Sequence, residues 1–312
     1  MDGLKLASLL VLGGCILQGS TAVEPFLEDY LQEHVAVRDL TIRSDGEELY
    51  FSSQSLFGEL SAILSMVREE DGQWSEPQLA PFSGSYNDLE PFLSPDGLRL
   101  YFASNRPREG NDGEDYDIWY VERESLAGDW SRPVNPGAPV NSGANEFYPA
   151  ITEDGDYFFT SDREGSLGKD DIFHWRTGGT DEPSALGTAV NSDGYEFNAF
   201  VAPDGSFLIY TAYNRPGGHG SGDLYISYRQ EDGSWGASEN LGPEINSSRM
   251  DYCPFVDAEG FLYFTSKRIA FPEAPFGIRS TKSLTDLTSQ HANGQSRLYK
   301  VSKPDIIKLN DE

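Results

Sequence analysis

The chain has 312 residues, and 23 Lys plus Arg against 51 Asp plus Glu give a formal net charge of −28. Such an excess of acid argues against nucleic-acid binding and against docking on anionic lipid, because both need basic surfaces. A hydrophobic content of 38%, with 18 Phe and 16 Tyr, is too high for a disordered chain, and two cysteines exclude a scaffold built from disulfides. The length allows one large all-β domain with a sizeable core.

Residues 1–22 are predicted to be a signal peptide. Lys5 precedes an apolar run from Leu6 to Leu12 that is too short to span a bilayer. The segment 12–15, Leu-Gly-Gly-Cys, resembles a bacterial lipobox, in which Cys15 would become the lipidated first residue. Cleavage after Ala22 is the alternative and would give a secreted protein, and an ordinary apolar strand is the third interpretation. We therefore expect an exported protein, either a periplasmic or outer-membrane lipoprotein or a soluble secreted form.

A turn dipeptide recurs along the rest of the chain at intervals of about 50–58 residues. Each copy follows an apolar strand and precedes an aromatic one, a pattern that predicts a β-hairpin because glycine accepts positive φ. Third strands are expected to begin at Asp117, Asp171 and Asp223, and fourth strands near Trp74, Trp130 and Trp235. The five turns are Asp45-Gly46, Asp96-Gly97, Asp154-Gly155, Asp204-Gly205 and Glu259-Gly260.

Four antiparallel strands repeated at this period predict a β-propeller, because a single small sheet cannot bury both of its faces. Five units fill residues 36–312, so we expect an all-β, five-bladed propeller, with six blades as the rival count. The last unit lacks a clear fourth strand. Residues 23–35 are interpreted as a tether that could also supply this strand and close the ring.

The segment 91–97, Pro-Phe-Leu-Ser-Pro-Asp-Gly, is followed by Leu100-Tyr101-Phe102 and by Asp117-Ile118-Trp119. This run resembles the WD-like repeat of TolB-type β-propellers, and related runs occur at 149–173, 199–225 and 254–268. The resemblance implies the propeller fold. Its members include periplasmic protein-binding modules and lipoproteins, and propellers in general also include glycosidases and lyases. The first copy departs from the pattern, with Arg43-Ser44 before its Asp-Gly turn.

One acidic position recurs nine residues before the turn glycine in four of the five copies. In a propeller this position starts the inner strand, so we expect a rim of carboxylates at one mouth of the central channel. Arginines follow the second strand at Arg106, Arg163 and Arg268, with Arg215 one residue out of register; copy one has Val37 and Ser55 instead. The four acids are Asp88, Glu146, Glu196 and Asp251. They either bind a ligand, or pair with the arginines and fix the blades together.

We interpret this face as binding an envelope protein or a carbohydrate without chemistry, with the protein acting as a monomer. The alternative is a glycoside hydrolase or polysaccharide lyase with Glu146 and Glu196 as the catalytic carboxylates. His219, in a glycine-rich loop, is a candidate ligand or base, although a solvated loop histidine is the simpler interpretation. No cofactor is expected; the acidic segment 111–115 suggests Ca²⁺, but lacks the spacing of a known calcium loop. A membrane would be contacted only through the lipid on Cys15.

Overall fold

The computed structural model describes residues 22–110, 112–113, 115–271 and 277–302. Cys15 and nearly all of the predicted signal peptide lie outside these residues. Within the described ranges, neither helix has the length and apolar character needed to cross a membrane.

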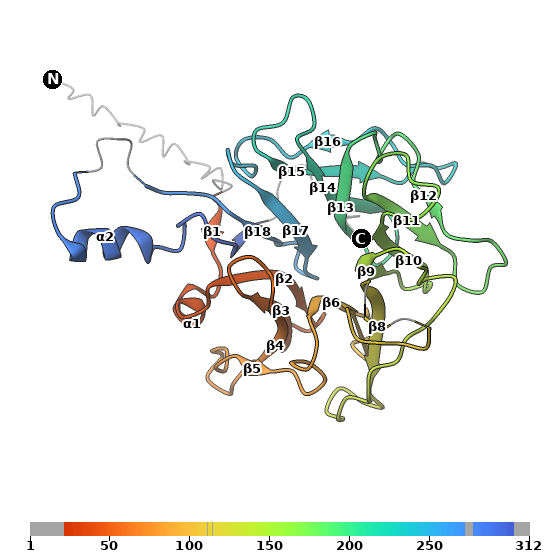
Figure 1. Cartoon of the computed structure of the whole chain (residues 1–312), viewed down its shortest axis with the longest axis horizontal. Helices are drawn as coiled ribbons and strands as arrows, with labels where there is room; N and C mark the ends of the chain where they lie inside the picture. Colours follow the sequence, from red (N-terminus) through yellow and green to blue (C-terminus); the bar gives the residue numbers. More distant parts are fainter. Residues whose placement is uncertain (1–21, 111, 114, 272–276, 303–312) are drawn as a thin grey trace, which may run out of the picture.

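Five antiparallel sheets are arranged around a central axis, which confirms the prediction of a five-bladed β-propeller (Figure 1). Blade 1 holds β2 (Ala36–Ile42), β3 (Glu48–Gln54), β4 (Ser61–Val67) and β5 (Gln78–Leu79); blade 2 holds β6 (Asp88–Leu93), β7 (Arg99–Ser104) and β8 (Asp117–Glu122). Blade 3 holds β9 (Glu146–Ile151), β10 (Tyr157–Ser161), β11 (Asp171–Trp175) and β12 (Ser184–Ala185). Blade 4 holds β13 (Tyr195–Val201), β14 (Phe207–Tyr213), β15 (Gly222–Tyr228) and β16 (Glu239–Asn240).

Blade 5 is assembled from both ends of the described chain. It holds β17 (Asp251–Val256), β18 (Leu262–Ser266) and β19 (Arg297–Val301), and its outermost strand is β1 (Glu24–Pro25). Glu24 pairs with Lys300, and the Phe26 amide donates to Leu298 O at 2.9 Å. The Phe26 ring also packs edge-on against Tyr263, with centroids 4.8 Å apart. The first strand therefore closes the ring, and the short α1 (Glu28–Leu31) then leads into blade 1.

The outermost strands are shorter than predicted and begin after the tryptophans near which we expected them. Trp74 and Trp235 form only isolated bridges to Arg68 and Arg229, and the two-residue strands β5 and β16 follow them. In blade 2 a single bridge between Tyr120 and Val134 takes the place of the fourth strand. Edge strands this short offer little backbone for pairing with another chain.

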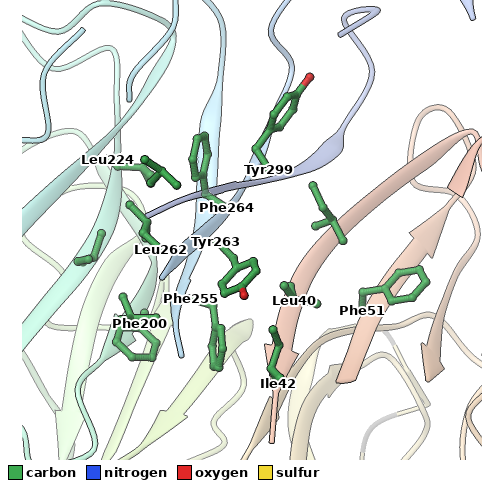
Figure 2. Packing of buried hydrophobic residues seen from close by; sticks show 14 of the residues in the cluster. Leu40, Ile42, Phe51, Phe200, Leu224, Phe255, Leu262, Tyr263, Phe264 and Tyr299 are labelled. Carbon is green, nitrogen blue, oxygen red and sulfur yellow. The ribbon is translucent and has the colours of Figure 1, made fainter. Parts of the chain in front are cut away.

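The core lies between neighbouring blades and is built from alternate residues of the strands. Figure 2 shows Phe51 of blade 1 and Phe264 and Tyr299 of blade 5 in the largest of the buried clusters. Phe51 and Phe264 are fully buried, and each such ring contributes about 1.5–3 kcal/mol through burial. The turn glycines need their positive φ; at Gly97, φ is 69°, and an added Cβ would lie 3.0 Å from Leu126. This packing fixes the inner strands around the axis.

The long connection from β18 to β19 carries the second helix, α2 (Thr281–Thr288). Ser280 caps it by accepting from the Ser283 amide, and none of the helix residues is buried. Figure 1 shows α2 projecting from the side of the ring. His291, near the end of this connection, is buried and its Nε2 lies 2.8 Å from Leu298 O, so this histidine anchors the loop to blade 5.

Candidate functional site

The four predicted acids occupy one equivalent position, the first residue or nearly the first of each inner strand in blades 2 to 5. Their side chains are not exposed. Asp88, Glu146 and Asp251 have no exposed surface, and Glu196 is 1% exposed. Buried carboxylates need charged or hydrogen-bonding partners, and each of these has several.

Asp88 shows the arrangement in blade 2. Its Oδ1 accepts from Ser104 Oγ at 2.6 Å and from Arg106 Nη2 at 2.5 Å, while Oδ2 accepts from Ser83 Oγ at 2.8 Å. Arg106 also donates to Phe82 O at 3.2 Å. Ser83 and Phe82 belong to the connector from blade 1, so this group of residues ties the connector to the next inner strand. We call such a group of acid, serine and arginine a clamp.

The clamp of blade 3 follows the same plan. Glu146 accepts from the Ser142 amide at 2.9 Å, from Ser142 Oγ at 2.6 Å, and from Arg163 Nη2 at 2.8 Å. Arg163 also donates to Pro139 O and Val140 O of the connector. Burial raises the pKa of Glu146, while the serine and arginine partners oppose that rise. The partners thus offset part of the cost of burying this carboxylate.

The clamps of blades 4 and 5 complete the series. Glu196 accepts from the Ser192 amide and hydroxyl and from Arg215, and Asp251 accepts from Ser247, Ser266 and Arg268. Arg215 reaches its acid although it lies one residue later, because β14 runs on to Tyr213 and Asn214 turns with a φ of 50°. Blade 1 has Val37 and Ser55 instead and follows the N-terminal segment, not a connector.

Of the two alternatives stated for the four acids, these contacts favour pairing with the arginines over an open ligand-binding rim. The oxygens of Asp88, Glu146, Glu196 and Asp251 point into the sheets and are occupied by donors, as the blade-fixing alternative requires. Arg106, Arg163, Arg215 and Arg268 are held in the same clamps. The sequence therefore identified the position of the four acids. It left open whether their side chains face a ligand or the arginines.

The connector motif Val/Ile-Asn-Ser completes each clamp in blades 3 to 5. In Val190-Asn191-Ser192, the serine binds the acid and the asparagine binds the third strand. Asn191 Oδ1 accepts from the Ile172 amide at 3.0 Å, and its Nδ2 donates to Ile172 O and Leu186 O. Asn141 and Asn246 make equivalent bonds. The asparagine extends the backbone pairing of the blade with its side chain.

Two residues after each clamp acid, the inner strand bulges towards the channel. All five equivalent residues have the left-handed conformation, with φ between 48° and 62°, which side chains other than glycine adopt at a cost. The strand pairing shifts register at the same place in every blade. These residues differ from blade to blade: Asp39, Glu90, Tyr148, Asn198 and Cys253.

These bulge residues join with Arg38 in one buried polar network across the channel. Arg38 donates to Asp39 Oδ1 at 2.6 Å and to Glu90 Oε1 at 2.7 Å, and lies 3.4 Å from Cys253 Sγ. Glu90 also accepts from the Tyr148 amide at 2.8 Å and from Asn198 at 3.1 Å. We call these residues the channel network; it connects all five blades.

The channel network holds more acid than its one arginine balances. Burial raises the pKa of Glu90 to about 7, and Asp39 adds to this rise while Arg38 opposes it. Asp39 Oδ2 is buried and has no hydrogen-bond partner among the described residues. Sequence reasoning missed this pair of carboxylates because neither repeats along the chain.

The residues just before the bulges line the channel mouth. Phe147, Phe197 and Met250 are partly exposed and pack against a buried cluster of Tyr148, Tyr252 and Cys253. The Arg38 guanidinium lies 5.1 Å from the centre of the Tyr252 ring, and Lys267 Nζ lies 6.0 Å from it. We define the mouth cluster as Phe147, Phe197, Met250, Tyr252, Arg38 and Lys267. Partial burial and the charge of Arg38 lower the pKa of Lys267.

The remaining predicted site residues lie elsewhere. His219 is exposed in the loop between β14 and β15, and its backbone amide donates to Asp223 Oδ2 at 2.6 Å. Residues 111 and 114 of the acidic segment considered for Ca²⁺ lie outside the described residues. In the part of the chain that the structure describes, no group of three or more His, Cys, Asp or Glu is placed to hold a metal ion.

No protein-family model matches the sequence, and no curated protein matches it either. Among solved structures, a glycoside hydrolase is similar at 8% identity with a TM-score of 0.53, covering 94% of this chain and 92% of that one. An α-L-arabinofuranosidase from Podospora anserina is similar at 13% identity with a TM-score of 0.50, covering 91% and 94%.

TolB from Acinetobacter baumannii is also similar, at 15% identity with a TM-score of 0.47, covering 86% of this chain. The chain spans 55% of the length of that TolB. At identities this low, the likeness to the two hydrolases with the higher scores shows a shared β-propeller fold and leaves the function open.

Proposed function

We propose that this protein is an exported, lipid-anchored binding module that holds an acidic carbohydrate at the mouth of its channel. The observation that carries the proposal is the mouth cluster: Lys267 and Arg38 lie near the Tyr252 ring, and Phe147 and Phe197 pack against the buried cluster that contains this tyrosine. In a chain of net charge −28, the exposed Lys267, which forms no ion pair among the described residues, favours an anionic ligand at this point.

The chemistry of the mouth cluster fits a uronic acid. Aromatic side chains pack against the apolar face of a sugar ring, while a few placed polar groups fix its orientation. Lys267 would pair with the sugar carboxylate, because Arg38 already donates to Asp39 and Glu90, and such charge-assisted bonds are the stronger kind. An acidic segment of an envelope protein would supply a carboxylate without a sugar ring. The test must therefore distinguish an acidic sugar from an acidic protein segment.

The clamps support binding over catalysis by the residues that the sequence suggested. A general acid or base must come within hydrogen-bond reach of the reacting atoms. Glu146 and Glu196 are buried and already accept several bonds each, so a substrate at the mouth would not reach them. We therefore assign these two residues to the architecture.

Calorimetry on the full chain tests the proposal, with an oligogalacturonate and its neutral methyl ester as ligands. We expect the acid form to bind at least about fivefold more tightly, and Lys267→Gln to remove that preference. Phe197→Leu should weaken both ligands. Lys282→Gln is the matched control, because Lys282 is exposed on α2 and pairs with the exposed Asp286 of the same helix. Equal binding of both ligands, or an equal effect of the control, would refute the proposal.

A second candidate function is carried by Glu90. A carboxyl group with a pKa of about 7, beside an acid of another environment, is the pairing that glycosidases use for acid–base work. Glu90 would be the acid and Asp39 the base or nucleophile. Because Glu90 is buried and bonded as the clamp acids are, both the mouth cluster and the channel network would have to open to admit substrate. Release of reducing ends from polysaccharide, abolished by Glu90→Gln in a folded protein, would favour this enzyme over the binding module.

Anchoring is tested separately from binding. If Cys15 carries lipid, labelled palmitate should enter the wild-type protein and not Cys15→Ser, and only the wild type should sediment with membranes. Incorporation in neither would leave the secreted form.

A further inference from the structure

The far end of the central channel contains a cavity of about 550 Å³ that the mouth cluster does not share. Residues from all five blades line it, around the turns that follow the inner strands. The inner strands start at the mouth and end at these turns, so the cavity opens on the opposite face of the ring. Its volume lies in the range of small-molecule sites, which is about 300–1,000 Å³.

The walls of this cavity are aromatic and aliphatic. Phe92, Phe200 and Phe255 contribute rings from three blades, and the centroids of Phe200 and Phe255 are 5.5 Å apart. Figure 2 shows Phe200, Phe255 and Ile42, each from a different blade, at one level of the channel. Towards the mouth, a void of about 10 Å³ lies between residues that include Leu40 and three prolines next to bulge residues, Pro91, Pro149 and Pro254. The residues that line the cavity do not include any of the mouth cluster.

The rim of the cavity is acidic. Glu153, Asp204 and Asp257 line it, and its lining residues, all within the described ranges, include no lysine or arginine. Glu153 and Asp204 are exposed. Asp204 caps its turn by accepting from the Ser206 amide at 2.9 Å and Oγ at 2.6 Å, so its place at the rim is fixed. The rim therefore has the opposite charge character to the mouth cluster.

We propose that this cavity binds an apolar organic cation, such as a quaternary or aromatic ammonium compound. The faces of phenylalanine rings attract a cation through the ring quadrupole. The acidic rim attracts the same charge and repels anions. An apolar body fills the aromatic walls, which offer a neutral polar ligand few partners. The site is independent of the carbohydrate proposal, because it lies on the other face and selects the opposite charge.

Ligand-observed NMR on the full chain tests this site with phenyltrimethylammonium and its uncharged isostere tert-butylbenzene. We expect the cation to bind at least about fivefold more tightly than the isostere, and Phe92→Leu to weaken both. Equal affinities, or binding of neither compound, would overturn the proposal.

Two rim variants locate the charge preference. Glu153→Gln with Asp204→Asn should bring the cation close to the affinity of the isostere, while the isostere binds as before. Glu231→Gln with Asp232→Asn is the matched control, because Asp232 caps an exposed turn through Ser234 with the same 2.9 and 2.6 Å contacts as Asp204. An equal loss in the control pair would show general attraction to an acidic protein and would overturn the site.

Discussion

The clamps and the channel network both bury charged groups on the inner strands, yet one repeats and the other does not. Each clamp sets one acid against one arginine and joins one connector to one blade, four times over. The channel network occurs once, has a different residue in every blade, and joins two acids to one arginine. Repetition in a propeller therefore indicates architecture, and departure from it indicates where to look for function.

The largest expected effect comes from breaking a clamp. Arg106→Ala leaves Asp88 buried without its cation. We expect the free energy of unfolding, measured with denaturant, to fall by about 3–5 kcal/mol. Arg99→Ala is the control in the same blade, because the Arg99–Glu122 pair is half exposed. Such pairs contribute about 0–1 kcal/mol. Similar losses in both variants would mean that the clamps are not the main ties between connector and blade.

A smaller loss is expected from the connector asparagine. Asn191→Ala leaves the amide and carbonyl of Ile172 buried without their side-chain partner, which should cost about 1–3 kcal/mol. Denaturant unfolding measures it. If Asn191→Ala lowers the free energy of unfolding by less than about 0.5 kcal/mol, the clamp acid alone, and not the asparagine, stabilises the connector.

The channel network should give stability a pH dependence that the clamps do not. Because burial raises the pKa of Glu90 from its ordinary value of 4.5 to about 7, the folded state holds a proton that the unfolded state has lost. This contribution is full below pH 4.5, declines as pH rises, and is gone above about 7. Glu90→Gln should remove a slope of up to about 1.4 kcal/mol per pH unit in that window.

Urea titrations between pH 4 and 8 measure this slope. Glu182→Gln, at an exposed position, serves as the control and should leave it unchanged. If the wild type and Glu90→Gln have parallel pH profiles, Glu90 is ionised throughout, and the contrast between the two regions weakens.

The smallest expected effect concerns Lys267. Because its pKa is lowered, its charge should be lost at a lower pH than that of a free lysine, and affinity for an acidic oligosaccharide should fall as that charge is lost on raising the pH. Calorimetry at pH 7 and above checks this. Lys267→Gln should show a flat profile, and a wild-type profile equally flat would remove Lys267 from the site.

Much of the fold could be predicted because it rests on local chemistry. Asp-Gly turns such as Asp96-Gly97 mark hairpins, and their spacing gives five blades. The register of Asp88 and Arg106 was also readable. The alternation of apolar and polar residues along a strand could not predict the bulge at Glu90. There a positive φ turns the side chain towards the axis.

The candidate site was largely missed for the same reason. Arg38, Glu90 and Lys267 come from blades 1, 2 and 5, and nothing in their local sequence marks them as neighbours. The sequence did contain one indication of the bulge residues: the residue two positions after each acid differs in every copy, while the acidic position itself repeats. Serines such as Ser142, four residues before Glu146, also indicated that the acid was already partnered.

The most direct test compares Glu196→Gln with Lys267→Gln in one assay of oligogalacturonate affinity, with the stability of each measured alongside. We predict that Glu196→Gln lowers stability and binds as the wild type does, and that Lys267→Gln keeps stability and loses affinity. A folded Glu196→Gln protein that no longer binds, beside a Lys267→Gln protein that still does, would contradict the account.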